Sequence, residues 1–435
     1  MSGAEFLLPP GTKDFLPDRA ERLAEIQAVA FNVFNRWGFR LVVMPGFEHL
    51  EVFSLGSSPD LEAAAFKLND RATGKVIAIT PDFTPQVARL VASRMRELPR
   101  PLRLFYGGRV LRDRPNGSAR SRELFQAGVE LIGLESAEAD AEMIAMAVES
   151  VSELGISDFR ISVGQLEFIR AILSSAELSS GVELHVRAAL AKKDVSGLNS
   201  IVRDQGLSSE KAEMICALPG LYGGQEVLTK AAGLCQDKAA QLALKNLNQV
   251  LATVEIYGLS DYISIDLGEM RGFGYHTGVI FEGFVPGQGF AVLKGGRYDS
   301  LLGKYGLDCP ATGFTLNLEA LLLARESRGL TAKKGGLDFL IISLESDKRR
   351  ALEMAKALRG MNFRVARDII ERDINGSLIY AERNRIARAL ILGHPGCQRD
   401  EVILKNVLGG EEVILKIDDI ISGSFPGSAG EAEPG

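Results

Sequence analysis

The chain has 435 residues, of which 46% are hydrophobic. This is enough for two or three packed domains, and it excludes a disordered chain, a collagen and a miniprotein. The 50 lysines and arginines against 56 aspartates and glutamates leave a net charge of −6, which excludes a basic coat for nucleic acid.

The four cysteines lie far apart, and no CxxC pair occurs. The N-terminus has no charged-then-apolar segment typical of a signal peptide. We therefore expect a reducing, cytoplasmic location and no metal site. No apolar run reaches the roughly 18 residues of a membrane helix, so we expect no membrane contact. A P-loop is also missing, and we expect no cofactor.

The first predicted element is a long amphipathic helix. Asp18 and Glu21 have the spacing of a capping box, and the apolar residues recur every three or four positions until Gly38. The β-rich segment 39–44 then predicts a strand that stops at Pro45, because proline cannot donate to a ladder.

Further strands are predicted at 75–80, 103–111, 124–132, 262–266, 277–284 and 289–294. A helix is expected over 137–154, capped by Ser136 and ended by Gly155. Strands that follow one another directly favour an antiparallel sheet with helices on its faces, so we assign an α+β fold.

The pattern indicates a core over residues 1–330, with a helical insertion at about 174–259. A composition change near 331–336 then precedes buried strands at 337–344, 363–366 and 389–392, which alternate with helices. We interpret 336–421 as a small α/β domain. The tail 422–435 is rich in Gly, Ser, Pro and Glu, and we expect it to be disordered.

The first candidate site residue follows the strand at 75–80. Asp82 lies between Thr80 and Thr84, just before a helix that begins near Pro85. Its carboxylate could bind an ammonium group or cap that helix, and the sequence leaves both interpretations open.

The second candidate region is a hairpin whose loop contains Asn116 and Gly117. Arginines at its ends, among them Arg112, could grip a carboxylate or a phosphate. Gln126, Gly128 and Glu130 fall on one face of the second strand, because alternate residues point the same way. They predict either a polar cavity over the sheet or a solvent-facing sheet surface.

Two glycine-rich segments, 271–278 and 295–299, complete the set of candidates. Glycines let the backbone approach a ligand, and nearby Arg271, Tyr275, His276 and Tyr298 supply donors. His276 could act as a general base or as a hydrogen-bonded structural group.

These segments occur in an order that resembles class II histidyl-tRNA synthetase. The likeness rests on segments 11–17, 80–84, 112–130, 271–277, 295–299 and 310–314, with the helix and strand up to Pro45 and Glu48. It covers nearly the whole chain. It implies a mixed six-stranded antiparallel sheet with helices, an anticodon-binding-like C-terminal domain, and a homodimer formed by the first helix and the strand ending at Pro45.

Two departures from that family bear on catalysis. Arg114 stands where the synthetase has a glutamate, and Ala320 stands where the third motif has an arginine. Removing one preorganised donor that stabilises developing charge typically costs about 3–4 kcal/mol. We therefore expect adenylation to be crippled.

The histidine signature departs as well, with Gly274 for an aspartate and His276 for a tyrosine. The Tyr-His-Thr-Gly run and segment 218–228 resemble the regulatory subunit of ATP phosphoribosyltransferase, a synthetase paralogue. The resemblance implies a histidine-binding pocket built from Asp82, Thr84, Arg112, Gln126, Glu130, Arg271, Tyr275, His276 and Tyr298.

Charge also argues against RNA binding by the C-terminal region. Residues 331–435 contain 16 lysines and arginines and 16 aspartates and glutamates, so their net charge is 16 − 16 = 0. Affinity for RNA depends largely on contacts to phosphates, so this region should bind tRNA poorly.

The leading hypothesis is a noncatalytic regulatory subunit in the first step of histidine biosynthesis. It would bind the catalytic subunit of ATP phosphoribosyltransferase and L-histidine, and carry feedback inhibition by histidine. The alternatives are a histidyl-tRNA synthetase and a synthetase-like binding module for another protein or a tRNA.

We also expect a homodimer. Phe31, Phe34 and Trp37 exceed the needs of one core-facing stripe of the first helix, and Phe47 follows the adjoining strand. The alternative is that these aromatic residues fill the core of the protomer itself.

Overall fold

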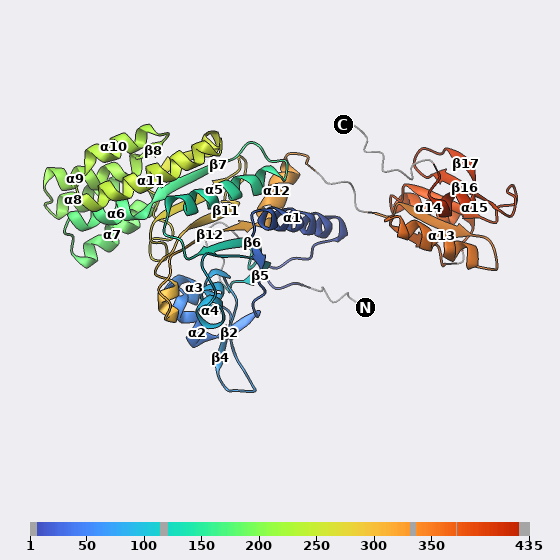
Figure 1. The fold of residues 1–435 in the computed structure, drawn as a ribbon, viewed down its shortest axis with the longest axis horizontal. Helices are drawn as coiled ribbons and strands as arrows, with labels where there is room; N and C mark the ends of the chain where they lie inside the picture. The colour runs from blue at the N-terminus through green and yellow to red at the C-terminus, as the bar shows by residue number, and fades with distance from the viewer. Residues whose placement is uncertain (1–6, 114–120, 331–335, 371, 426–435) are drawn as a thin grey trace. The chain divides into compact units, whose positions relative to one another are not determined.

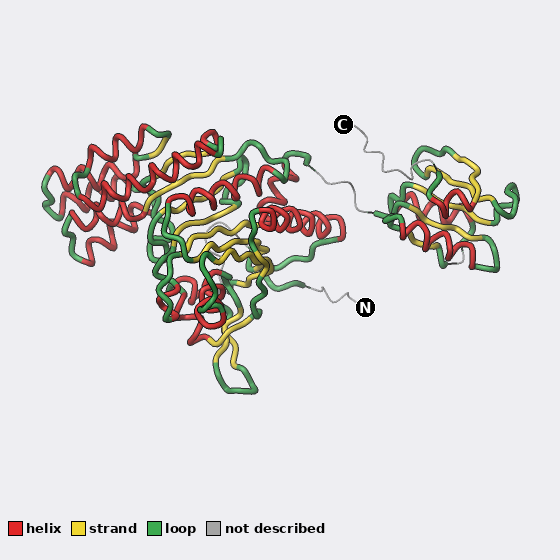
Figure 2. Tube along the Cα trace, in the orientation of Figure 1, coloured by secondary structure: helices red, strands yellow, loops and turns green. Residues whose placement is uncertain are grey.

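The structure is a computed structural model that describes residues 7–113, 121–330, 336–370 and 372–425. The chain divides into two compact units between Thr331 and Ala332. Each unit is described by itself (Figures 1 and 2).

The first unit is built around a nine-stranded sheet within the described residues. Its strands lie in the order β1 (Arg40–Leu41), β5 (Leu102–Leu111), β6 (Glu123–Ile132), β12 (Ala311–Asn317), β11 (Leu293–Arg297), β10 (Val279–Phe284), β7 (Arg160–Gln165), β9 (Ile263–Asp266) and β8 (Tyr222–Gly223). The six strands from β5 to β7 pair antiparallel. Strand β1 pairs parallel with β5, and β9 pairs parallel with β7. Strand β8 pairs antiparallel with β9. The expected six-stranded antiparallel core is thus present, with three short strands added.

Three helices cover one face of this sheet (Figure 1). They are α1 (Pro17–Arg36), α5 (Ala137–Ser152) and α12 (Leu318–Ser327). Side chains alternate along β6, so Ala127, Val129 and Leu131 face these helices and are fully buried. Gln126 and Glu130 therefore face the opposite side, where the functional cavity lies.

Smaller elements flank the opposite side of the sheet. A second sheet has the order β2 (Phe47–His49), β4 (Val76–Ile79) and β3 (Lys67–Asn69). Near it lie α2 (Leu50–Gly56), α3 (Pro59–Ala63), α4 (Thr84–Arg94) and the short helix η3 (Leu302–Tyr305).

The helical insertion comprises residues 180–256. It follows α6 (Leu166–Ser175) and contains α7 (Ser180–Ala191), α8 (Val195–Asp204), α9 (Ser209–Ala217), η1 (Leu218–Gly220), α10 (Glu226–Leu234) and α11 (Lys238–Ile256). Helix α11 packs against α5 and α6. The short helix η2 (Ser260–Tyr262) then leads into β9.

The second unit contains a five-stranded sheet with helices on both faces. Its strands have the order β14 (Val365–Arg367), β13 (Phe339–Ser343), β15 (Arg388–Leu392), β16 (Glu401–Asn406) and β17 (Glu412–Lys416). Strands β14, β13 and β15 are parallel to one another. Strand β16 pairs antiparallel with β15, and β17 pairs antiparallel with β16. Helices α13 (Arg349–Gly360) and α15 (Ile417–Ser422) share one apolar cluster, and α14 (Ile374–Arg383) belongs to another.

Several local predictions need correction. Helix α1 begins at Pro17, so Asp18 lies in its first turn and is not its cap. Within the segment 39–44, where a strand was expected, the structure has only the two-residue strand β1. The strand expected at 289–294 begins later, as β11. Seven strands of the structure were not predicted: β2, β3, β7, β8, β12, β16 and β17. The loop with Asn116 and Gly117 lies outside the described residues.

The disordered tail was predicted to begin too early. Ser422 ends α15, and Phe425 is 5% exposed because its ring packs near Phe339 in the core of the second unit. Residues 426–435 lie outside the described residues.

The aromatic residues of α1 and of its C-cap pack against the protomer's own core. Phe34 is fully buried, and Phe31 packs edge-on against Phe105. The Trp37 indole N–H donates to Glu149 at 2.7 Å. Phe34 therefore fills the core of the protomer, whereas Phe31 and Trp37 are half-buried against it, and the homodimer stays a prediction.

Candidate functional site

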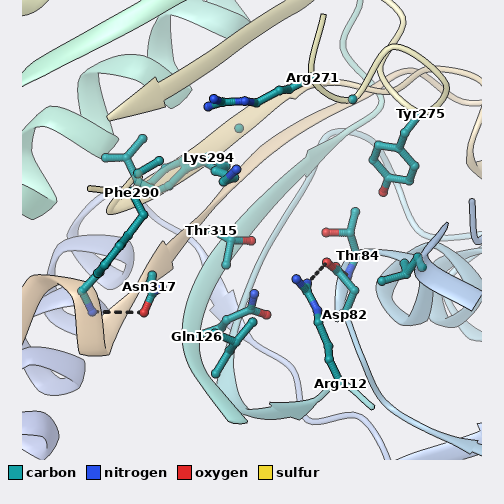
Figure 3. A pocket seen from close by; sticks show the side chains of 18 of the residues that line it. Asp82, Thr84, Arg112, Gln126, Arg271, Tyr275, Phe290, Lys294, Thr315 and Asn317 are labelled. Atoms are coloured by element: carbon teal, nitrogen blue, oxygen red, sulfur yellow. Dashed lines mark hydrogen bonds and ion pairs between the residues drawn. The ribbon is translucent and has the colours of Figure 1, made fainter. Parts of the chain in front are cut away.

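A cavity of about 970 Å³ lies over the sheet face opposite α1. All nine residues proposed from the sequence line it: Asp82, Thr84, Arg112, Gln126, Glu130, Arg271, Tyr275, His276 and Tyr298. Figure 3 shows that Asp82, Arg112 and Gln126 lie at one end, while Arg271 and Lys294 lie across the cavity. The polar face of β6 is thus the floor of a cavity, as one of the two interpretations predicted.

Glu130 is the buried acid at the centre of the site, 1% exposed. The Tyr106 hydroxyl donates to Oε1 at 3.1 Å, and the Tyr298 hydroxyl donates to Oε2. Burial raises the pKa of Glu130 to about 8, although these hydrogen bonds favour the ionised form. A cationic group bound beside Glu130 would lower this pKa again, because an opposite charge favours the ionised form.

Tyr106 reaches Glu130 because position 128 on the neighbouring strand is glycine. Residues 106 and 128 are directly paired across β5 and β6. A Cβ at Gly128 would lie 2.6 Å from the Tyr106 hydroxyl and 2.8 Å from the carbonyl oxygen of Phe314. The glycine therefore leaves room for the tyrosine to cross the sheet surface.

Asp82 both orders the start of α4 and points into the cavity. Its Oδ1 accepts from the Thr84 backbone N–H at 3.1 Å, and its Oδ2 lies 3.4 Å from Arg112 Nη2. Arg112 also donates from Nε to the Pro81 carbonyl at 3.0 Å. The Asp82 carboxylate therefore both stabilises the turn before α4 and lines the cavity.

The loop that enters β10 contributes Tyr275 and His276. The Tyr275 hydroxyl is buried and has no hydrogen-bond partner among the described residues. His276 Nδ1 lies 3.3 Å from the Arg297 carbonyl oxygen, and burial lowers the pKa of His276 to about 4. The ring is thus a neutral donor to a carbonyl, which favours its structural interpretation over that of a general base.

The basic side chains across the cavity share one buried partner. Glu282 accepts from Arg271 Nη1 at 2.5 Å, and Lys294 Nζ lies 2.8 Å from its other oxygen. Arg271 also lies 3.8 Å from Glu269. These cations are therefore largely compensated within the chain.

The start of α12 forms a separate part of the cavity wall. Asn317 Oδ1 accepts from the Ala320 N–H at 3.1 Å and caps the helix, and Glu319 pairs with Lys13. The Ala320 methyl presents no charge where the synthetase family has an arginine. The other departure, at Arg114, lies outside the described residues.

This geometry suits a small zwitterion better than a polyphosphate. Two carboxylates and unpartnered or shared tyrosine hydroxyls can hold an ammonium group, and Arg112 can contact a carboxylate. A polyphosphate would have to break the internal ion pairs of Lys13 and Arg271.

Sequence reasoning missed several residues that line the cavity or support it. They are Lys13, Tyr106, Lys294, Thr315 and Asn317. Tyr106 could have been found from strand pairing, because it lies opposite Gly128. Lys13 lies in segment 11–17, which carried the family resemblance, whereas Lys294, Thr315 and Asn317 come from distant segments and carry no local signal.

The described part of the chain contains no helix long and apolar enough to cross a membrane. Nor do its histidines, cysteines and carboxylates gather in groups of three or more that could hold a metal ion.

Comparison with known proteins shows what the chain resembles. A family model described as histidyl-tRNA synthetase matches residues 11–321. An ATP phosphoribosyltransferase regulatory subunit from Geobacter sulfurreducens is 45% identical over 97% of both chains. One from Moorella thermoacetica is 39% identical over 83% of this chain and 92% of the relative.

Solved structures are similar over most of the chain. A structure described as an ATP phosphoribosyltransferase regulatory subunit/histidyl-tRNA synthetase from Bacillus halodurans has a TM-score of 0.80 and 28% identity, covering 90% of this chain and 99% of that one. A histidyl-tRNA synthetase from Nostoc has a TM-score of 0.82 at 20% identity, over 97% and 99% of the two chains, which shows the shared fold.

Proposed function

This chain belongs to the ATP phosphoribosyltransferase regulatory subunit family, and we propose that it is a noncatalytic regulator whose old substrate cavity now binds histidine. It would bind the catalytic subunit of ATP phosphoribosyltransferase, enable that subunit's activity and carry feedback inhibition by histidine. The protein would act in the cytoplasm, at the first step of histidine biosynthesis.

One observation carries the proposal. The amino-acid end of the cavity keeps Asp82, Glu130 and the tyrosines, while the start of α12 has Ala320 and a self-paired Glu319. The residues that would recognise an amino acid thus lie apart from those that would activate a nucleotide. At the start of α12, Ala320 replaces the arginine that activation would need. A site that binds without activating fits a sensor of histidine concentration.

The proposal predicts activity only in the presence of the partner. Mixing the chain with the catalytic subunit should give phosphoribosyl transfer at least tenfold above either protein alone, and histidine should inhibit it. The chain alone, with ATP, histidine and tRNA, should give no pyrophosphate exchange and no aminoacylation. A separate complete synthetase is the positive control.

The same assay decides between this proposal and its alternatives. Histidine-dependent pyrophosphate exchange would identify a histidyl-tRNA synthetase, the alternative that the matched family model favours. If the chain neither stimulates the catalytic subunit nor catalyses exchange, it would instead be a binding module for another partner.

We further propose that the chain forms a homodimer through the segment that follows α1. Leu41 is 51%, Val43 85% and Phe47 58% exposed, so this edge of the unit presents apolar side chains to solvent. This surface keeps the predicted segment around Pro45 and Phe47 and leaves out the aromatic residues of α1.

Light scattering should give the mass of a dimer at micromolar concentration. Val43→Glu with Phe47→Glu should give a monomer, whereas the matched double change Leu242→Glu with Ile256→Glu, at exposed positions of α11, should leave the dimer intact. A wild-type monomer would disprove this part of the proposal.

A further inference from the structure

The loop between β9 and β10 forms one wall of the cavity and supplies Arg271, Tyr275 and His276. Within the loop, the backbone N–H groups of Tyr275 and His276 both donate to the Gly272 carbonyl at 2.8 Å. These short-range bonds form a tight turn. The carbonyls of Phe273, His276 and Thr277 instead find their donor on another element.

Arg170 on α6 provides those donors. Its Nη2 donates to the carbonyls of Phe273, at 2.7 Å, and His276, at 2.5 Å, and its Nη1 donates to Thr277 at 3.1 Å. One planar guanidinium group therefore fixes three carbonyls within five residues of chain. A lysine ammonium is a single point donor and cannot span the same three positions.

Phe273 connects this loop to the helical insertion. The Arg170 guanidinium carbon lies 4.7 Å from the centre of the Phe273 ring, and that of Arg187 lies 4.2 Å away. Arg187 belongs to α7, where it also lies 3.8 Å from Glu183. The ring thus contacts one cation from α6 and one from the insertion.

The insertion also holds the strand that leads into the loop. Lys193 Nζ lies 2.5 Å from Asp266 Oδ2, and the Leu267 N–H donates to the Leu221 carbonyl at 3.0 Å. Tyr222 of β8 pairs with Asp266 of β9. The loop is therefore anchored to the insertion at its entry and to α6 at its exit.

We propose that Arg170 is a positioning residue for the cavity, and that the Phe273 contact with Arg187 couples the cavity to the helical insertion. A ligand that contacts Tyr275 and His276 restricts the loop, and the loop restricts α7 through Phe273. The coupling rests on the proposed function, because histidine is the ligand that would bind.

The first experiment tests Arg170 with the conservative variant Arg170→Lys in the full chain. Calorimetry should show histidine binding weakened about tenfold or more, because the variant disturbs the three hydrogen bonds that the charged Arg170 guanidinium donates to the loop carbonyls. Hydrogen exchange of the 273–277 amides should accelerate in the ligand-free protein. The unfolding midpoint of the first unit, read from the single tryptophan, Trp37, should change little. Unchanged affinity and unchanged loop exchange would overturn the positioning role.

The second experiment tests the coupling with Arg187→Ala, which leaves the carbonyl bonds of Arg170 in place. Histidine should still bind within about threefold of wild type, but it should no longer slow hydrogen exchange in α7. Arg203→Ala, an exposed arginine on α8, is the matched control and should keep the response. An undiminished α7 response in Arg187→Ala would overturn the coupling.

The two hypotheses fail in different ways. If wild-type protein binds no histidine, the proposed ligand is wrong. The comparison of loop exchange between ligand-free wild type and Arg170→Lys would still decide whether Arg170 positions the loop.

Discussion

Replacing Glu130 by Gln and Asp82 by Asn together should abolish measurable histidine binding. Both changes keep the shape of the side chain and remove its negative charge. A hydrogen bond to a charged group contributes about 1.5–3 kcal/mol, so losing two should weaken binding by about 100-fold or more. Loss of histidine sensitivity in the assay with the catalytic subunit should accompany this.

The double variant should remain folded. With Asp82→Asn, the amide side chain keeps an oxygen for the Thr84 N–H, and with Glu130→Gln it keeps a carbonyl oxygen for a tyrosine hydroxyl. Asp158→Asn is the matched control, because Asp158 is an exposed partner of Arg328 outside the cavity. Binding by the double variant within threefold of wild type would show that histidine does not use this cavity.

Arg297→Met should destabilise the first unit by about 3–5 kcal/mol, the usual cost of removing one partner of a buried ion pair. Arg297 Nε lies 3.0 Å from Asp140 Oδ2, and Nη1 lies 3.0 Å from Asp299 Oδ1. The Asp140 side chain is only 1% exposed. Without Arg297, it would be buried without a charged partner.

Urea unfolding followed by Trp37 fluorescence measures this effect in the first unit alone. Arg328→Met is the control, because it leaves only Asp158 without a partner, and that side chain is 58% exposed, so the pair should contribute about 0–1 kcal/mol. Adding Asp140→Leu to Arg297→Met should recover part of the loss, since the unpaired carboxylate is then gone. Equal effects of Arg297→Met and Arg328→Met would contradict the buried-pair argument.

A regulatory subunit and an enzyme need different things from this cavity. A regulator needs a pocket that discriminates a ligand and a surface that responds to it. Glu130, Tyr106 and Tyr298 give the first, because their buried hydrogen bonds fix the polar groups in place. The contact between Phe273 and Arg187 offers a route for the second.

The sequence by itself determined the family, the order of the main elements and the face of β6 that lines the cavity. These follow from local signals. The helical spacing in α1 and the alternation of Gln126, Gly128 and Glu130 can be read within short windows, and the family follows from the order of short motifs along the chain. The nine site residues that the family resemblance implied all line one cavity.

The tertiary structure alone decided which aromatic residues are core and which charges are paired. Phe34 is buried by Phe105 and Phe314, which lie far along the chain, so its helix could not reveal whether it faces solvent. Asp140 and Arg297 are 157 positions apart. Many of the residues that meet at the cavity likewise come from distant parts of the chain. Spacing reports only which residues share a face, whereas packing between distant segments determines what that face contacts.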